Sequence, residues 1–418
     1  MIIPRQKYLN ELIDLRHNGM IKIVTGIRRS GKSFLLFELF STCLANQGVR
    51  NDHIIKIDLE NLRNSELRDP RLLLEFIDSR IIDDEMHYVL IDEVQMVRDF
   101  QDVLVSYLKI HNVDVYVTGS NARFLSKDIV TNFRGRGFEI KVYPLSFSEF
   151  YPACNARSIV SAYNDYSLYG GLPQILLLPS DELKVRYLKD LYNETYIRDI
   201  RERYNIRNDE ELDNLITILA SSIGSFVNPT NLTNAMKTVL KSSLSRPTIV
   251  KYLDYIKDAF LVEQAQRYDV KGKRYLDTQS KYYFTDLGLR NARLNFRQNE
   301  PTHIMENIIF NELLYRGFNV DVGQVSVVRR DESGVQSRAT YEVDFVCNKG
   351  SQRYYIQSAY RLPTEEKIEQ EERSLRHIND SFKKIIIVGH EQKPRHNEYG
   401  ITTIGLFDFL INPDSLDF

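Results

Sequence analysis

The run GIRRSGKS at residues 26–33 has the most specific chemistry in this chain, because it fits G-x-x-x-x-G-K-[ST] without a mismatch. Glycines let a loop's backbone amides converge on phosphate oxygens, and a following helix adds its positive N-terminal end. In this pattern Lys32 contacts the β- and γ-phosphates and the Ser33 hydroxyl ligates Mg²⁺. The residues expected to contact the nucleotide are Gly26, Ile27, Arg28, Arg29, Ser30, Gly31, Lys32, Ser33 and Phe34.

Two acids, Asp92 and Glu93, follow a short apolar run at residues 88–91. Asp92 at the end of a strand would hold Mg²⁺, mostly through water, and Glu93 would polarise the attacking water as general base. Solvated acids at a strand end are the alternative for this pair taken alone. The preceding glycine loop favours the hydrolytic interpretation.

Further polar groups follow later strands of the same region. Ser120 and Asn121 come after the strand predicted at residues 113–118, where they would either sense the γ-phosphate or cap a helix. Arg134 and Arg136 lie on a glycine-flanked loop. They would act as an arginine finger, in their own subunit or in a neighbour, or they are solvated charges on a surface turn.

These groups need a scaffold that brings strand ends together. Apolar runs predict strands at residues 21–25, 53–58, 88–91, 113–118 and 138–143, alternating with helical stretches such as 34–40, 71–82 and 100–110. Such alternation predicts an α/β fold with a parallel sheet and a ligand at the carboxyl ends of its strands.

The motifs together resemble a known family. The glycine loop, the Asp-Glu pair, TGSN at 118–121, RGRGF at 134–138 and YPLSFSEF at 143–150 are similar to prokaryotic AAA-superfamily P-loop ATPases that carry a C-terminal domain of unknown function. YGGLP at 169–173 and YIRDI at 196–200 fit the same family. The resemblance implies an ATP-binding core with strand order 5-1-4-3-2 and self-assembly, without a settled biological role.

Two of these runs keep a structural alternative. YGGLP reads as a turn, either structural or a hinge after the ATPase core. Arg198 lies in a helical stretch at about 184–203. It is a second candidate for phosphate contact or an intersubunit ion pair, and a plain surface charge is the alternative.

The middle of the chain predicts a winged helix. Helices are expected over 212–226, then up to about 240, and from Ser245 onward, where Ile249, Leu253, Ile256 and Phe260 form one apolar stripe. Two strands, 261–268 and 281–284, flank a basic turn. DNA contacts would come from the third helix and the wing: Arg246, Thr248, Lys251, Lys257, Arg267, Lys271, Lys273 and Arg274. The alternative is a protein-packing module with solvated charges.

The last part resembles the PD-(D/E)-x-K nuclease-like fold. A helix at 303–316 carries Glu306, a strand at 341–346 carries Asp344 with Glu342 nearby, and a strand at 353–359 and a helix at 364–379 follow. A polar loop is expected at 329–340. Active members have Glu-x-Lys where this chain has Gln357, Ser358 and Ala359, so we expect a degenerate fold without nuclease activity, although the acids could still bind metal weakly.

Composition sets the limits. The 418 residues include 55 basic and 57 acidic ones, so the net charge of −2 excludes a uniformly basic nucleic-acid binder but allows a local basic face. Three distant cysteines suggest neither disulfides nor a zinc ribbon, and no apolar run or leader suggests a membrane or export, so a cytoplasmic protein is expected. The expected domains are an ATP-binding core (1–165), a helical connector (166–207), a winged helix (208–295) and a nuclease-like domain (296–418).

The leading hypothesis is an Mg²⁺-dependent ATPase that works as an oligomeric motor or switch on DNA. The alternative is a regulatory nucleotide switch that contacts protein partners and no DNA.

Overall fold

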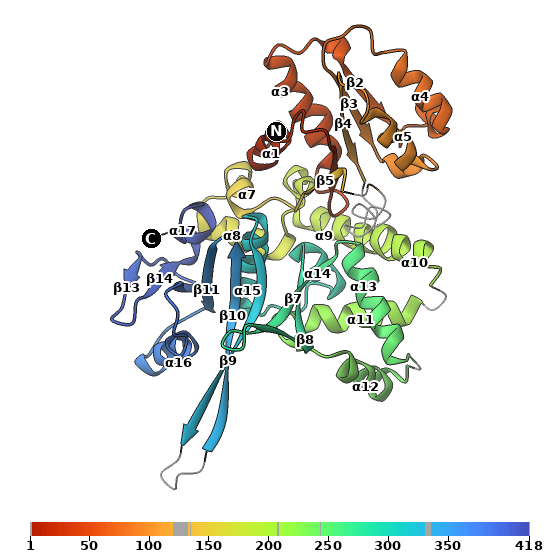
Figure 1. The fold of residues 1–418 in the computed structure, drawn as a ribbon. Coiled ribbons are helices and arrows are strands. Elements are labelled where there is room, and N and C mark those ends of the chain that lie inside the picture. Colours follow the sequence, from red (N-terminus) through yellow and green to blue (C-terminus); the bar gives the residue numbers. More distant parts are fainter. Residues whose placement is uncertain are drawn as a thin grey trace. The chain divides into compact units, whose positions relative to one another are not determined.

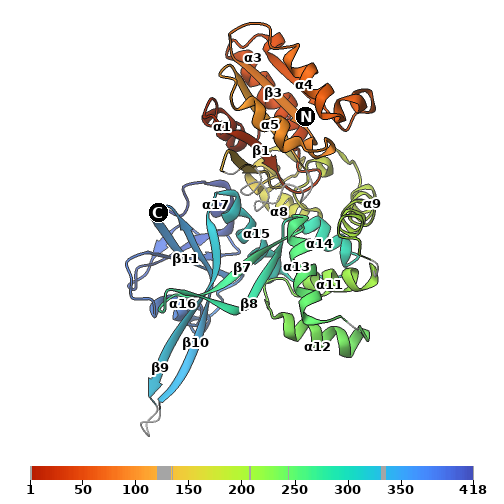
Figure 2. The ribbon, with the colours of Figure 1, turned by 45° about the vertical axis from the view of Figure 1, so that its right-hand side comes forward.

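The computed structural model describes residues 2–119, 133, 135–206, 209–242, 244–330 and 336–417. The chain divides into two compact units, Met1–Pro144 and Leu145–Phe418, which we describe one at a time (Figures 1 and 2). Within the described residues, none of the helices combines the length and the apolar character needed to cross a bilayer.

The first unit contains a five-stranded parallel sheet with the order β2-β3-β4-β1-β5, which confirms the predicted order. Its strands are β1 (Ile21–Thr25), β2 (Ile54–Asp58), β3 (His87–Asp92), β4 (Val113–Thr118) and β5 (Gly137–Lys141). All residues of β1 and β3 are buried, as expected for central strands covered by helices on both faces.

Helices cover both faces of this sheet. Figure 1 shows α1 and α3 on one side and α4 and α5 on the other. The helical segments of this unit are α1 (Gln6–Asp14), α2 (Lys32–Phe34), the π-helical η1 (Leu35–Phe40), α3 (Ser41–Asn46), η2 (Asn51–His53), η3 (Leu62–Arg68), α4 (Pro70–Asp78), η4 (Val94–Met96) and α5 (Phe100–Tyr107). The α4 helix begins at Pro70 because the Asp69 side chain accepts hydrogen bonds from the amides of Arg71 and Leu72.

A charged residue lies inside β1. Lys22 is fully buried and pairs with Asp114 of β4, which also accepts a hydrogen bond of 2.8 Å from the Tyr116 hydroxyl. Burial lowers the pKa of Lys22, whereas the charge of Asp114 raises it. The pair explains how a lysine is tolerated in the sequence IKIVT of a central strand.

The second unit is built on a nine-stranded sheet of order β13-β14-β12-β11-β10-β9-β7-β8-β6. Its strands are β6 (Phe226–Val227), β7 (Val262–Asp269), β8 (Arg274–Phe284), β9 (Asn319–Arg330), β10 (Gln336–Lys349), β11 (Gln352–Ala359), β12 (Lys383–Val388), β13 (Arg395–His396) and β14 (Ile401–Gly405). Figures 1 and 2 show β9 and β10 continuing together beyond the other strands as a long hairpin.

That hairpin corrects one expectation. The polar stretch 329–340 was expected to be a loop, but β9 runs to Arg330 and β10 starts at Gln336, so most of the stretch is strand. Polar residues such as Ser337 and Arg338 are exposed there, which is compatible with a two-stranded ribbon in solvent.

The helical segments of the second unit are α7 (Phe147–Ala153), α8 (Ile159–Tyr169), η6 (Pro173–Leu177), α9 (Asp181–Asp190), η7 (Leu191–Ile197), α10 (Arg198–Tyr204), α11 (Asp209–Ser221), α12 (Pro229–Leu240), α13 (Arg246–Asp258), α14 (Leu287–Arg293), α15 (Pro301–Tyr315), α16 (Glu365–Arg376) and α17 (Leu406–Ile411). Phe310 of α15 stacks on Tyr283 at 4.1 Å between ring centroids, whereas Leu375 of α16 packs with Val343 and Ile386.

Three helices, α11, α12 and α13, precede the antiparallel pair β7 and β8, as predicted. The apolar stripe is confirmed, because Ile249, Leu253 and Ile256 are buried. However, β7 also pairs in parallel with β9, so the two strands of the predicted wing belong to the same sheet as the C-terminal strands. The winged-helix interpretation remains a prediction.

The YGGLP run forms a tight turn against the start of α14. The Asp286 carboxylate accepts a hydrogen bond of 2.8 Å from the Gly171 amide and one of 3.0 Å from Leu289 at the start of α14. A Cβ atom on Gly170 would lie 2.3 Å from an Asp286 oxygen, and one on Gly288 would lie 2.1 Å from the Tyr169 carbonyl oxygen. Gly170 therefore leaves room for the Asp286 carboxylate, and Gly288 lets the backbone of α14 approach the backbone of Tyr169.

Candidate nucleotide site and other candidate sites

The glycine loop begins at the end of β1 and is packed against the segment that follows β5. Gly26 has a φ of +133°, and a Cβ atom there would lie 2.1 Å from the carbonyl oxygen of Val142. Gly31 ends the loop with a φ of +93°. Both positions require glycine, so the first and last glycines of the motif have a direct structural reason.

Lys32 is the first residue of the helix that follows the loop. Its side chain is buried, and its ammonium donates hydrogen bonds of 3.1 Å to the carbonyl oxygens of Gly26 and Ile27. Burial lowers the pKa of Lys32 to about 8, although the carboxylates of Glu93 and Asp92 act in the opposite direction. A cation held against the backbone of a glycine loop is suited to bind an anion.

Ser33 and Asp92 meet at the carboxyl edge of the sheet. The Ser33 hydroxyl donates to Asp92 Oδ1 at 2.9 Å, and the Thr118 hydroxyl donates to the same oxygen. Burial raises the pKa of Asp92, while both hydroxyl contacts lower it. A hydroxyl and a carboxylate are the hard oxygen ligands that Mg²⁺ prefers, so this donor set fits Mg²⁺.

Glu93 stands beside Asp92 in the left-handed region, with φ 54° and ψ 46°. Its amide donates to Thr118 Oγ1 at 3.0 Å, and its carboxylate accepts from Gln95. Thr118 therefore fixes both acids, a role that sequence reasoning did not assign. The available signal was its position at the end of the strand beside β3.

The remaining predicted nucleotide contacts differ in exposure. Ile27 and Ser30 are buried, Arg28 is half-buried, and Arg29 is exposed with a φ of +65°. The residues Ser33, Phe34 and Arg136 are exposed. The candidates Ser120, Asn121 and Arg134 lie outside the described residues.

The basic residues predicted to contact DNA fall into two groups. Arg246 and Lys251 are exposed on α13. Lys271 and Lys273 are exposed in the turn between β7 and β8, and Arg274 is exposed at the first position of β8, directly after that turn.

The other three basic or polar candidates are less available. Lys257 pairs with Asp254 at 2.9 Å and donates to Gln264. Arg267 lies over the Phe226 ring, 4.9 Å from its centroid, and Thr248 is bonded to the Ser245 cap.

The acids of the predicted nuclease-like domain surround a lysine that sequence reasoning missed. The ammonium of Lys281, on β8, lies 2.8 Å from Glu306, 2.5 Å from Glu342 and 3.9 Å from Asp344. The Tyr283 hydroxyl donates to the same Glu306 oxygen at 2.6 Å. The sequence offered little to identify Lys281, because a lysine beside the aromatic residues of a strand belongs to no known motif.

The charged groups of this cluster shift the pKa values of one another. The Lys281 ammonium lowers the pKa of Glu306, whereas burial and the Glu306 charge raise the pKa of Asp344 well above its ordinary value. Asp344 also accepts a hydrogen bond of 2.8 Å from the Ser358 amide, and Gln357 contacts the Asp344 amide at 3.4 Å. The cluster thus has an internal cation and backbone partners that account for Asp344.

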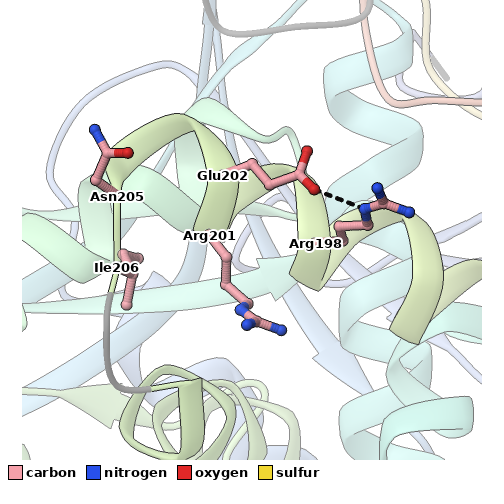
Figure 3. Close-up of a pocket in the computed structure, with 5 residues that line it drawn as sticks. All are labelled: Arg198, Arg201, Glu202, Asn205 and Ile206. Carbon is pink, nitrogen blue, oxygen red and sulfur yellow. Dashed lines mark hydrogen bonds and ion pairs between the residues drawn. The ribbon is translucent and has the colours of Figure 1, made fainter.

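Arg198 lines a cavity of about 780 Å³ along α10, together with Arg201, Glu202, Asn205 and Ile206 (Figure 3). Its guanidinium pairs with Glu202 at 2.7 Å, one helical turn away. Both side chains of the pair are largely exposed. The geometry within this unit is that of a surface ion pair, whose contribution to stability is small.

One group of described residues, His53, Asp83 and His87, has metal-ligand spacing. Both His87 ring nitrogens already contact backbone, Nδ1 at 2.8 Å from the Glu85 oxygen and Nε2 at 3.2 Å from the Ile82 amide. Arg50 also lies 2.7 Å from Asp83. A guanidinium inside the group disfavours a second cation.

Comparison with known proteins gives two domain matches. Residues 18–151 match an AAA domain, and residues 160–300 match a domain of unknown function, DUF8612. An uncharacterized protein of Haemophilus influenzae is 34% identical over 98% of this chain and 99% of its own length. An uncharacterized protein of Methanocaldococcus jannaschii is 30% identical over 86% of this chain and 79% of its own length.

Among solved structures, the Aeropyrum pernix ORC1 protein in complex with DNA is 12% identical over 71% of this chain and 93% of that chain, with a TM-score of 0.29. A TM-score this low does not establish a shared fold over the aligned region.

Proposed function

Because the chain belongs to the family of AAA-domain proteins that includes this Haemophilus influenzae relative, we propose that it binds ATP with Mg²⁺ and hydrolyses it. The observation that carries the proposal is the contact between Ser33 and Asp92 beside the buried ammonium of Lys32. A cation for the phosphates and oxygen ligands for Mg²⁺ meet there at the carboxyl edge of a parallel sheet, where such sheets bind ligands.

Each group has a distinct role in this proposal. Lys32 and the loop amides bind the β- and γ-phosphates, and Ser33 and Asp92 hold Mg²⁺, which neutralises phosphate charge. Glu93 accepts a proton from the attacking water, and Thr118 keeps its backbone in place. Ser120 or Asn121 senses the γ-phosphate, and Arg134 or Arg136 contacts it in the same subunit or in a neighbouring copy.

Lys32→Ala tests the nucleotide site. Loss of a charge-assisted contact of about 1.5–3 kcal/mol weakens ATP binding roughly 10- to 100-fold and removes turnover. Titration of a fluorescent ATP analogue measures the affinity. Lys56→Ala, at an exposed lysine of β2, is the control and leaves affinity unchanged. Equal affinity in Lys32→Ala and in the unaltered protein would exclude the proposed site.

We propose DNA as the partner and a homo-oligomer as the working form. The five exposed basic residues of α13 and the β7–β8 turn support this, since a local cationic face can bind phosphates despite a neutral total charge. Charge reversal of Lys271, Lys273 and Arg274 then weakens duplex binding and reduces its salt dependence. We expect the Glu93→Gln variant with ATP bound to assemble into a homo-oligomer, and size-exclusion chromatography measures this.

A switch that contacts only protein partners is the second candidate. The pairing of β7 with β9 favours it, because wing strands that belong to a larger sheet can serve packing rather than DNA contact. ATPase rates with and without a panel of DNA and RNA structures separate the two. Stimulation by a nucleic acid, lost on charge reversal of the turn, supports the first; no stimulation supports the second.

Nuclease activity is not part of the proposal. Lys281 already pairs with Glu306 and Glu342, and Gln357 and Ala359 stand where active nucleases have Glu and Lys. We expect no Mg²⁺-dependent DNA cleavage. Cleavage that disappears in Asp344→Ala would contradict this.

A further inference from the structure

Arg5 precedes α1 and connects the N-terminal segment with the glycine loop. Its Nη1 donates to the Ser30 carbonyl oxygen at 3.2 Å, and its Nη2 donates to the Tyr143 carbonyl oxygen at 2.6 Å. Arg5 is only 6% exposed, and its guanidinium also lies over the Tyr8 ring, 4.8 Å from the centroid. One buried side chain therefore bonds two segments far apart in the sequence.

The Ser30 contact fixes a peptide plane inside the loop. In a trans peptide the carbonyl oxygen and the following amide hydrogen point in opposite directions. With the Ser30 oxygen bonded to Arg5, the amide of Gly31 must point away from Arg5. Gly31 precedes Lys32, so this amide is one of those that the motif directs at phosphate. Rotation of the same plane would turn a carbonyl oxygen toward the anion instead.

Through its hydrogen bond to Tyr143, the same guanidinium also holds the segment that packs against the first glycine of the loop. Tyr143 follows Val142, whose carbonyl oxygen lies where a Cβ atom of Gly26 would be. The Tyr143 amide in turn donates to the Tyr8 hydroxyl at 3.0 Å. The backbone that supports Gly26 and the peptide before Gly31 are thus both held by Arg5.

The backbone of Arg5 has an unfavourable conformation. It has φ 48° and ψ 43°, in the left-handed region that is uncommon for residues other than glycine. Such conformations persist where surrounding contacts impose them, and they cluster at functional sites. The Arg5 carbonyl also accepts the Tyr8 and Leu9 amides at the start of α1, so the conformation places guanidinium and helix together.

We propose that Arg5 is a positioning residue for nucleotide binding, which orients the Ser30–Gly31 peptide so that the Gly31 amide faces the phosphates. The inference rests on the proposed function. Arginine suits this role because its planar fork holds two nitrogens apart, and each donates to a different segment, whereas the ammonium of lysine is a single compact group.

The test compares Arg5→Lys, Arg5→Ala and Tyr8→Phe in the full chain. Tyr8→Phe removes the hydrogen bond between the Tyr143 amide and the Tyr8 hydroxyl of α1 but leaves Arg5 beside Ser30. It therefore controls for loosened packing of α1. We expect ATP affinity to fall at least about tenfold in Arg5→Ala and by an intermediate factor in Arg5→Lys, as for loss of a charged hydrogen bond. Tyr8→Phe lowers the melting temperature but keeps the affinity within about twofold.

A second readout needs no nucleotide. The ¹⁵N–¹H resonance of Gly31 shifts in Arg5→Lys and stays unchanged in Tyr8→Phe. The inference is overturned if both Arg5 variants bind ATP like the unaltered protein, or if Arg5→Lys leaves the Gly31 resonance in place. Absence of ATP binding in the unaltered protein would instead overturn the proposed function, and the resonance test would still decide the role of Arg5.

Discussion

At the scale of single residues, the buried cations have environments that composition does not reveal. Lys22, Lys32 and Lys281 are all buried, yet burial dominates for Lys32 while three carboxylates raise the pKa of Lys281 above its ordinary value. The same residue type thus serves an internal ion pair in β1, an anion site and a carboxylate cluster. Only the second of these has a sequence motif.

The lowered pKa of Lys32 predicts a pH dependence of nucleotide affinity. Bound phosphate favours the ammonium form, so affinity is full below pH 8 and falls above it by up to about tenfold per pH unit. Kd values for ATP from pH 7 to 9.5 measure this.

A parallel measurement of stability separates this loss of affinity from unfolding. The folded pKa lies below the ordinary 10.5, so the folded protein binds fewer protons, and the Lys32 contribution to the unfolding free energy rises with pH from about 8 to 10.5. Affinity that stays constant to pH 9.5 would contradict the lowered pKa of Lys32.

Lys281→Met tests the internal cation of the C-terminal cluster. Removing one partner of a buried ion pair leaves uncompensated charge on Glu306 and Glu342, and we expect a loss of about 3–5 kcal/mol in unfolding free energy. Chemical denaturation measures it. Lys257→Met is the control, because Lys257 pairs with Asp254 at a more exposed site and should cost under about 1 kcal/mol. Similar losses in both variants would contradict the assignment.

At the scale of elements, the glycine turn at 170–171 and the start of α14 depend on each other. We expect Gly288→Ala to lower the unfolding free energy by about 1–3 kcal/mol or more, because its Cβ atom would meet the Tyr169 carbonyl oxygen at 2.1 Å. Gly350→Asn is the control, since that turn is open and asparagine tolerates its positive φ. A change below 0.5 kcal/mol in Gly288→Ala, on the order of surface substitutions, would show that the turn can move apart.

Elements with strong local patterns were predictable, and those that depend on partners were not. The five apolar runs gave the strands of the first sheet, and the stripe Ile249–Leu253–Ile256 gave α13. The strand residues 329–330 and 336–340 were missed because strands exposed to solvent on both faces have no apolar alternation to detect. The pairing of β7 with β9 depends on residues far apart in the sequence, so no local pattern indicates it.

The candidate site divides in the same way. Gly26, Lys32, Ser33 and Asp92 follow from motif spacing alone, and the structure brings the last three together. Arg5 donates to backbone carbonyl oxygens, and the Thr118 hydroxyl oxygen accepts from the Glu93 backbone amide. Because nearly every residue offers such backbone groups, the partners of Arg5 and Thr118 form no recognisable motif.

At the scale of the whole molecule, a total charge near zero conceals separate acidic and basic groups of residues. The acids Asp92 and Glu93 lie at the carboxyl edge of the first sheet, and the exposed basic residues lie on α13 and the β7–β8 turn of the second unit. In the proposed cycle, hydrolysis in the first unit changes how the second unit holds DNA. A coupling of this kind requires that each ligand alters the affinity for the other.

The turnover of Glu93→Gln, measured together with its ATP affinity, is the most direct test of ATP hydrolysis by this site. We expect ATP affinity within about twofold of the unaltered protein, because Gln keeps the size of Glu93 and leaves Lys32 in place. We expect a steady-state ATPase rate lower by about 10²- to 10⁴-fold, the usual contribution of a general base. An unchanged rate in Glu93→Gln would contradict the assignment of Glu93 and the hydrolytic mechanism built on it.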